Sequence, residues 1–221
     1  MTATNGSHRD TKLVVFDLDG TLVDSSYDLC TGVNRMLASV GASPLEHAEV
    51  RSFVGEGARR LIEKAKAARG LAQDVDTLLP VFLASYREVV LETTRLYPGL
   101  RPLLDALAPR RVAVLTNKPG DLSRAILSGL GVAHCFHWIW GAGDFPGRKP
   151  DPSGLERLLA AAEVAPQDAV MIGDSAIDVR TARGAGVPAI GVTWGFHPES
   201  LDEAPPDIRV SRPADLRPLF S

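Results

Sequence analysis

The chain has 221 residues, of which 45% are hydrophobic and 23% are charged, proportions that are typical of a soluble globular protein. Its net charge of −3 gives no excess of basic residues, so nucleic acids and anionic membranes are not expected as partners. Two cysteines are too few for a disulfide-stabilised scaffold and favour a cytoplasmic location. The N-terminal segment MTATNGSHRDTK lacks the apolar core of a signal peptide and is expected to be a frayed tail, and no window approaches the ~20 apolar residues of a membrane span.

The first predicted element is a buried strand at residues 13–16. Its sequence, LVVF, is an unbroken apolar run, which is typical of a strand in a parallel sheet covered on both faces. Asp17 and Asp19 follow directly, and then Gly20 and Thr21. Carboxylates at the C-terminal end of such a strand lie where open α/β sheets bind ligands. Taken alone, this segment could instead be an ordinary turn with no ligand site, because Asp and Gly are common turn residues.

A helical insertion is predicted after the first strand, with no strand between Ser25 and Leu96. Three helices are expected in it: one capped by Ser25 or Ser26 and ended by Gly41, one over residues 57–69, and one over residues 74–94 that bends or breaks at Pro80. The sequence therefore predicts a helical cap domain over residues 25–96. The core domain would comprise residues 1–24 and 97–221.

Strands and helices alternate from residue 99 to the end of the chain. Strands are expected at residues 112–115, 137–140, 169–172, 189–192 and 208–210, and helices at residues 100–108, 121–130, 153–163 and 176–185. Alternation of this kind is typical of an α/β fold with a doubly wound, Rossmann-like parallel sheet.

Polar side chains follow three of the predicted strands, at ends that meet on one edge of the sheet. They are Asp17 and Asp19, then Thr116 and Asn117, then Asp174 with Asp178 one helical turn later, and Lys149 comes from the loop GRKPDP. Four carboxylates within ~5 Å of one another repel by roughly 3 kcal/mol per pair at an effective dielectric constant of 20. One lysine cannot offset that repulsion, whereas Mg²⁺ can, and it prefers oxygen ligands. An aspartate can also act as a nucleophile toward phosphorus.

These motifs resemble those of the haloacid dehalogenase-like hydrolase superfamily over nearly the full length of the chain. The resemblance rests on D-x-D-G-T at residues 17–21, on Thr116 at a strand end, on Lys149, and on G-D-x-x-x-D at residues 173–178. The cap position and the segments FVGEGARRLIEKA, LTNKP and PGRKPDP are similar to those of phosphoglycolate phosphatase-like members.

The resemblance implies a catalytic role for each core residue. Asp17 would be the nucleophile that takes the phosphoryl group, and Asp19 would protonate the leaving alkoxide and later activate water. Thr116 would hydrogen-bond a phosphoryl oxygen, Lys149 would neutralise the nucleophile and the transferring group, and Asn117 would join them in binding the substrate.

The resemblance also implies a Mg²⁺ site. The Asp17 carboxylate, the Asp19 backbone carbonyl and Asp174 would hold the ion. Asp178 would orient a metal-bound water or Lys149.

In the cap, Gly55, Glu56 and Gly57 begin the second predicted helix. Their backbone N–H groups could meet a substrate carboxylate, and a plain helix start is the alternative. The cap as a whole would close over the core, exclude water and select the leaving group.

The function expected from the resemblance is Mg²⁺-dependent hydrolysis of a small phosphorylated metabolite, with 2-phosphoglycolate the best single candidate. The alternatives are a phosphomutase of the β-phosphoglucomutase kind, a pyrophosphatase, a broad sugar-phosphate phosphatase, and a non-catalytic protein that binds a phosphorylated ligand. The sequence leaves open whether the protein is a monomer or a homodimer.

Overall fold

A parallel sheet in the order β5-β4-β1-β6-β7-β8 forms the centre of the computed structural model, which describes residue 8 and residues 10–221. Its strands are β1 (Leu13–Phe16), β4 (Arg111–Pro119), β5 (Trp138–Ala142), β6 (Ala169–Gly173), β7 (Ala189–Val192) and β8 (Ile208–Val210), and each pairs in parallel with its neighbours. The prediction of a parallel α/β sheet is confirmed. The expected N-terminal tail falls mostly on residues 1–7 and 9, which lie outside the described part of the chain.

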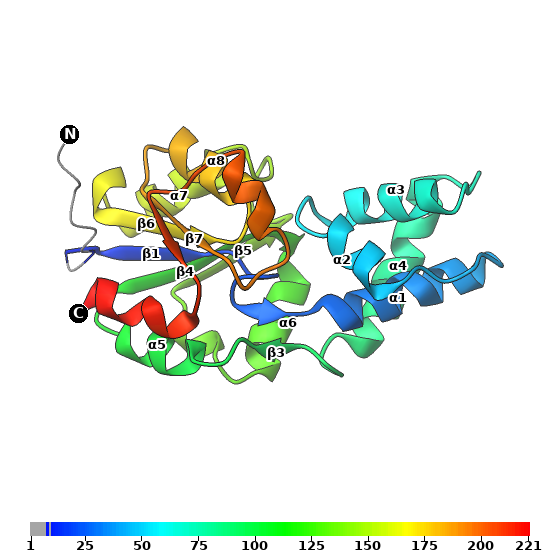
Figure 1. Cartoon of the computed structure of the whole chain (residues 1–221), viewed down its shortest axis with the longest axis horizontal. Coiled ribbons are helices and arrows are strands. Elements are labelled where there is room, and N and C mark those ends of the chain that lie inside the picture. The colour runs from blue at the N-terminus through cyan, green and yellow to red at the C-terminus, as the bar shows by residue number, and fades with distance from the viewer. Residues whose placement is uncertain (1–7, 9) are drawn as a thin grey trace.

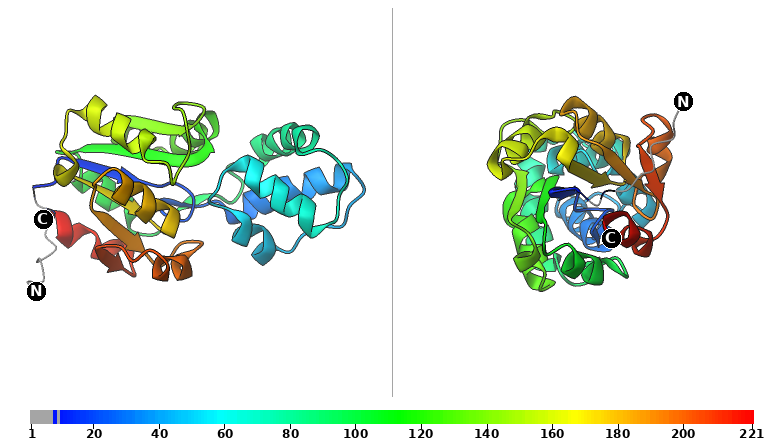
Figure 2. Two further views of the ribbon diagram at one scale, coloured as in Figure 1. Left: turned by 90° about the horizontal axis from the view of Figure 1, so that it is seen from above. Right: turned by 90° about the vertical axis from the view of Figure 1, so that its left-hand side faces the viewer.

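Helices cover both faces of this sheet (Figures 1 and 2). Val14 and Phe16 of β1 face one apolar cluster, and Leu13 and Val15 face the other, because successive side chains of a strand point to opposite faces. The first cluster contains side chains of α5 (Leu100–Ala106) and α6 (Gly120–Gly129), and the second contains side chains of α7 (Ser153–Ala162) and α8 (Ala176–Gly184). The sheet is thus doubly wound, as predicted.

Short 3₁₀ helices occupy several connections around the sheet. They are η1 (Ala133–Cys135), η2 (Pro166–Asp168), η3 (Pro198–Asp202), η4 (Pro213–Asp215) and η5 (Arg217–Phe220). Within the part of the chain that the structure describes, no helix is long and apolar enough to cross a membrane.

Four helices form a second body beyond the sheet, to the right in Figure 1. They are α1 (Ser26–Ser39), α2 (His47–Phe53), α3 (Ala58–Ala68) and α4 (Val75–Val89). Their apolar faces share a cluster that includes Val33, Met36, Ile62 and Phe82, and that also takes in Leu122 of the core. We call these helices the cap; its exact boundaries as a domain remain a prediction.

Two features of the cap differ from the prediction. The short helix α2 was not expected, although Glu46 and Glu49 form a capping box at its start and are visible in the sequence. Helix α4 ends at Val89 rather than near residue 94, and it runs through Pro80 without the break that was one of the two outcomes expected there. A proline inside a helix removes one backbone hydrogen bond, and the burial of Leu78 and Phe82 on either side of it holds the helix in place.

The cap joins the core through two crossing segments that pair as a short antiparallel ribbon. It consists of β2 (Val23–Asp24) and β3 (Arg95–Leu96). The expectation that no strand lies between Ser25 and Leu96 was therefore wrong at its far end. A two-residue strand shows no hydrophobic periodicity, so the sequence pattern could not reveal it.

Asp28 of α1 fastens the returning segment beside this ribbon. The carboxylate is 1% exposed and accepts hydrogen bonds from the backbone N–H and the hydroxyl of both Thr93 and Thr94. Replacing Asp28 by alanine would leave buried donors without an acceptor, so we expect the free energy of unfolding to fall by about 3 kcal/mol. Urea denaturation measures this loss, and an unchanged unfolding midpoint would show that the segment is held by other contacts.

Candidate active site

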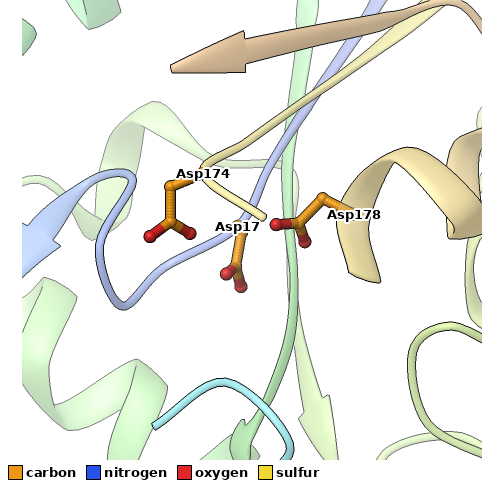
Figure 3. Close-up of side chains that lie close together, drawn as sticks. All are labelled: Asp17, Asp174 and Asp178. Carbon is orange, nitrogen blue, oxygen red and sulfur yellow. The ribbon is translucent and has the colours of Figure 1, made fainter. Parts of the chain in front are cut away.

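Three aspartates meet at the C-terminal edge of the sheet. Asp17 follows β1, Asp174 follows β6, and Asp178 lies in the first turn of α8. One carboxylate oxygen of each lies within 4.8 Å of the others, and all three residues are buried. Figure 3 shows the Asp17 side chain, on the segment after β1, beside those of Asp174 and Asp178 on the segment that leads from β6 into α8. The strand-end grouping expected from the sequence is therefore present for these residues.

Lys149 supplies positive charge inside this group. Its ammonium Nζ lies 2.7 Å from Asp17 Oδ1 and 2.7 Å from Asp178 Oδ1, and its side chain is 2% exposed. Burial acts to lower the pKa of Lys149, but the two carboxylates raise it above the usual value. The lysine is therefore held in its charged form.

The aspartates remain short of positive charge even with this lysine present. Burial raises the pKa of Asp17; Lys149 opposes that shift, and the charges of Asp178 and Asp174 add to it. Burial and Asp178 likewise raise the pKa of Asp174. Asp17 Oδ1 also lacks a well-directed hydrogen bond among the described residues, although it contacts the ammonium of Lys149. A cation would stabilise this arrangement.

The donor set fits Mg²⁺, which takes carboxylate and carbonyl oxygens. Both oxygens of Asp178 are occupied, one by Lys149 and one by the N–H and hydroxyl of Ser175. Asp174 instead uses Oδ2 to accept the backbone N–H groups of Phe196 and His197, which leaves Oδ1 with a single weak contact of 3.5 Å. Asp17 and Asp174 are thus better placed than Asp178 to bind a metal directly.

Two glycines make room for the Asp174 carboxylate. A Cβ atom added at Gly20 or at Gly195 would lie 2.3 Å from Asp174 Oδ2. Gly20 also has a φ of +83°, a conformation that L side chains rarely adopt. The glycine of the D-x-D-G-T segment therefore serves both the backbone turn and the position of Asp174.

Magnesium should stabilise the fold by binding this site. At a free concentration about 100 times its dissociation constant, a ligand adds about 2.7 kcal/mol to the free energy of unfolding. For a chain of this size that corresponds to a rise in Tm of roughly 5–10 °C. Thermal unfolding with Mg²⁺ and with a chelator measures the shift. The shift should vanish in Asp174→Asn and persist in Asp105→Asn, whose side chain is exposed on α5; an equal shift in both variants would place the ion elsewhere.

Thr116 and Asn117 are brought to the same edge by β4, but their side chains have different environments. The Thr116 hydroxyl accepts the Lys118 backbone N–H and is buried beside the aspartates' cavity. The Asn117 side-chain amide makes two hydrogen bonds with the Lys149 backbone: it donates to the carbonyl and accepts from the N–H. It also donates to the Gly55 carbonyl. Asn117 therefore fastens the Lys149 loop and the cap loop to β4.

The expectation of four clustered carboxylates was wrong for Asp19, because its side chain lies in a second, separate charged group with Lys118. Its carboxylate accepts from Lys118 Nζ at 3.0 and 3.1 Å and from the Ser25 hydroxyl at 2.6 Å. Lys118 also donates to the hydroxyl of Tyr86, at 2.8 Å. The sequence interpretation counted a single lysine in the site and missed Lys118 and Tyr86.

A small cavity of about 40 Å³ lies between the sheet edge and the cap. It is lined by Asp17, Asp19, Leu29, Val54, Gly55, Gly57, Ala58, Leu61, Phe82, Leu83, Tyr86, Thr116, Asn117, Lys118, Pro119 and Leu122. Gly55 and Gly57 thus reach the cavity, whereas the Glu56 carboxylate pairs with Lys64 at 2.6 Å and lines a wider groove outside it.

Comparison with known proteins agrees with this geometry. Residues 14–192 match the family model described as haloacid dehalogenase-like hydrolase. The phosphoglycolate phosphatase of Rhodospirillum rubrum is 44% identical over 199 residues, covering 86% of this chain and 83% of that protein. The phosphoglycolate phosphatase of Pseudomonas putida is 38% identical over 217 residues, covering 95% of this chain and 78% of that protein.

A solved structure shares the whole architecture. It is the crystal structure of a predicted phosphoglycolate phosphatase from Haemophilus somnus, with a TM-score of 0.91 and 29% identity, covering 96% of this chain and 99% of that one. The resemblance seen in the sequence motifs is confirmed: the chain belongs to the haloacid dehalogenase-like hydrolase family.

Proposed function

We propose that this protein is a Mg²⁺-dependent phosphomonoesterase that hydrolyses 2-phosphoglycolate to glycolate and phosphate. The observation that carries the proposal is the placement of Asp17. Its carboxylate lies at the end of β1, 2.7 Å from the Lys149 ammonium and on the wall of the cavity under the cap. A buried, charge-supported carboxylate that faces a cavity is suited to nucleophilic attack.

The reaction would use Asp17 and Asp19 in turn. Asp19 would have to carry a proton when the substrate binds. A carboxylate oxygen of Asp17 attacks phosphorus, the bond from phosphorus to the leaving oxygen breaks, and Asp19 donates its proton to that oxygen. Water then attacks the aspartyl-phosphate and passes a proton to Asp19, which restores both carboxyl groups and releases phosphate. Lys149 and the Thr116 hydroxyl would stabilise the charge on the transferring phosphoryl oxygens.

Mg²⁺ would be held by the Asp17 carboxylate, the Asp19 backbone carbonyl and Asp174. When bound, it would neutralise negative charge where phosphate and carboxylates meet. Asp178, whose oxygens are taken by Lys149 and Ser175, would act by fixing the position of the Lys149 ammonium.

Two observations support 2-phosphoglycolate as the substrate. Relatives of 38–44% identity are phosphoglycolate phosphatases by name. The cavity between the sheet edge and the cap is small, about 40 Å³, which favours a small leaving group over a sugar. Backbone N–H groups near Gly55 and Gly57 would contact that leaving group.

Phosphate release from a panel of substrates tests the proposal. The panel comprises 2-phosphoglycolate, glucose 6-phosphate, β-glucose 1-phosphate and pyrophosphate, each with Mg²⁺ and with a chelator. We expect a large Mg²⁺-dependent preference for 2-phosphoglycolate. Slow release from many sugar phosphates would favour a broad phosphatase, conversion of β-glucose 1-phosphate to glucose 6-phosphate would favour a phosphomutase, and no turnover would favour a binding protein.

A further inference from the structure

We propose that Lys118 and Tyr86 form the recognition site for a negatively charged group on the leaving part of the substrate. This inference rests on the proposed function and extends it, because it assigns the selection of an acidic leaving group to two side chains. One comes from the core strand β4 and the other from the cap helix α4, so the site is complete only when cap and core are together.

The Lys118 ammonium is buried and fully engaged. Its side chain is 3% exposed. An ammonium has three N–H donors and no acceptor, and the recorded contacts use all three: two with the Asp19 carboxylate and one with the Tyr86 hydroxyl. The Asp19 carboxylate, 3.0 and 3.1 Å from Nζ, lies beside the ammonium as its counter-charge.

The hydroxyl proton of Tyr86 has no hydrogen-bond acceptor among the described residues. The residue is 1% exposed and its hydroxyl accepts from Lys118. Burial raises the pKa of Tyr86 to about 12, so the phenol keeps that proton. A buried hydroxyl normally finds an acceptor, and an anionic oxygen in the adjoining cavity would provide one.

The cavity places these two groups where a leaving group must lie. Lys118 and Tyr86 both line it, together with Asp17 and Asp19, and Lys118 is the one cation among its described lining residues. Much of the remaining wall is apolar, including Leu61 and Phe82. A carboxylate entering such a space needs a charged partner, and Lys118 is that partner.

Recognition requires an exchange of contacts at Lys118. One N–H now directed at Asp19 would turn to the substrate carboxylate, and the Tyr86 hydroxyl would donate to the same group. Asp19 would keep its second contact with Lys118 and its hydrogen bond from Ser25 at 2.6 Å. A neutral leaving group offers no charge to drive this exchange.

A matched pair of substrates tests the proposal. 2-Phosphoglycolate and 2-hydroxyethyl phosphate have the same two-carbon skeleton, but the second carries a neutral hydroxymethyl group in place of the carboxylate. The measured quantity is the ratio of their kcat/KM values in wild type, Lys118→Met, Lys118→Arg, Tyr86→Phe and Arg87→Met. Arg87 is the control because it also joins cap to core, through an exposed ion pair with Asp121 at 2.8 Å.

We expect Lys118→Met to lower the preference for 2-phosphoglycolate by about 100-fold and Tyr86→Phe by about 10-fold, the usual cost of losing a charged and a neutral hydrogen bond to substrate. Lys118→Arg should keep most of the preference, and Arg87→Met should keep all of it. An equal fall in kcat/KM for both substrates would leave their ratio unchanged and reduce Lys118 to a group that only positions Asp19, and unchanged kcat/KM values for both substrates would remove Lys118 from the site. Either result overturns the proposal.

Binding separates this proposal from the proposed function. If wild-type protein releases no phosphate from 2-phosphoglycolate, calorimetry on Asp17→Asn still tests Lys118. The double variant with Lys118→Met should lose binding of 2-phosphoglycolate and keep binding of 2-hydroxyethyl phosphate. That result would support the recognition site although the activity had failed. Equal binding to Asp17→Asn with and without Lys118→Met would overturn it.

Discussion

Replacing Asp17 by asparagine is expected to lower kcat for phosphate release by about 100,000-fold or more, the scale seen when a catalytic nucleophile is removed. An amide has nearly the shape of a carboxylate but does not attack phosphorus. The protein should remain folded, because Asp178 still pairs with Lys149 at 2.7 Å and one buried negative charge is gone. Steady-state kinetics and thermal unfolding measure the two effects.

The control for this variant is Asp105→Asn, which makes the same chemical change at an exposed position of α5. Its kcat should stay within about two-fold of wild type, as is usual for surface substitutions. Appreciable turnover by folded Asp17→Asn would remove Asp17 from the role of nucleophile.

Lys149→Met should impair both activity and folding. Without its ammonium, three buried aspartates lose their shared counter-charge, and breaking a buried ion pair costs about 3–5 kcal/mol of unfolding free energy. The loss of charge stabilisation at the transferring phosphoryl group should lower kcat by about 1,000-fold. Urea denaturation and phosphate release measure these losses, and Mg²⁺ should recover part of the stability.

Lys12→Met is the matched control, because Lys12 forms an exposed ion pair with Asp168 at 2.8 Å. Removing such a pair costs about 1 kcal/mol or less. If Lys149→Met were no less stable than Lys12→Met without Mg²⁺, the buried aspartates would not depend on Lys149 for their charge balance.

The sequence predicted much of the fold because its signals are local. The unbroken run LVVF at β1 and the alternation of strands and helices after Gly99 identify a covered parallel sheet. Once the sheet is known, the rule that strand ends meet at one edge brings together Asp17, Thr116 and Asp174. In the structure these three residues lie at that edge of the sheet.

Lys118 escaped prediction because β4 is longer than its apolar run. The strand was expected to end at Leu115, yet it continues to Pro119. The register of β4 against β5 shifts between Leu115 and Pro119, and in this irregular stretch Thr116 and Lys118 both line the cavity. The apolar pattern stops at the site, where function requires polar residues.

Tyr86 could not have been found from local pattern at all. It lies on the buried stripe of α4 with Phe82, where an aromatic side chain usually indicates packing. Its contact with Lys118 depends on how the cap docks on the core, and that arrangement is set by long-range contacts such as the hydrogen bond from Asn117 to the Gly55 carbonyl and the ion pair of Arg87 with Asp121.

Trapping the phosphoenzyme tests most directly whether Asp17 is the nucleophile. Wild-type protein with Mg²⁺ would be quenched with acid during turnover of 2-phosphoglycolate, reduced with borohydride, and mapped by peptide mass spectrometry. Borohydride converts an acyl phosphate to an alcohol, so we expect that modification at Asp17, and none in protein treated without substrate. Phosphate release with an unmodified Asp17, or with the modification at another carboxylate, would contradict that role for Asp17.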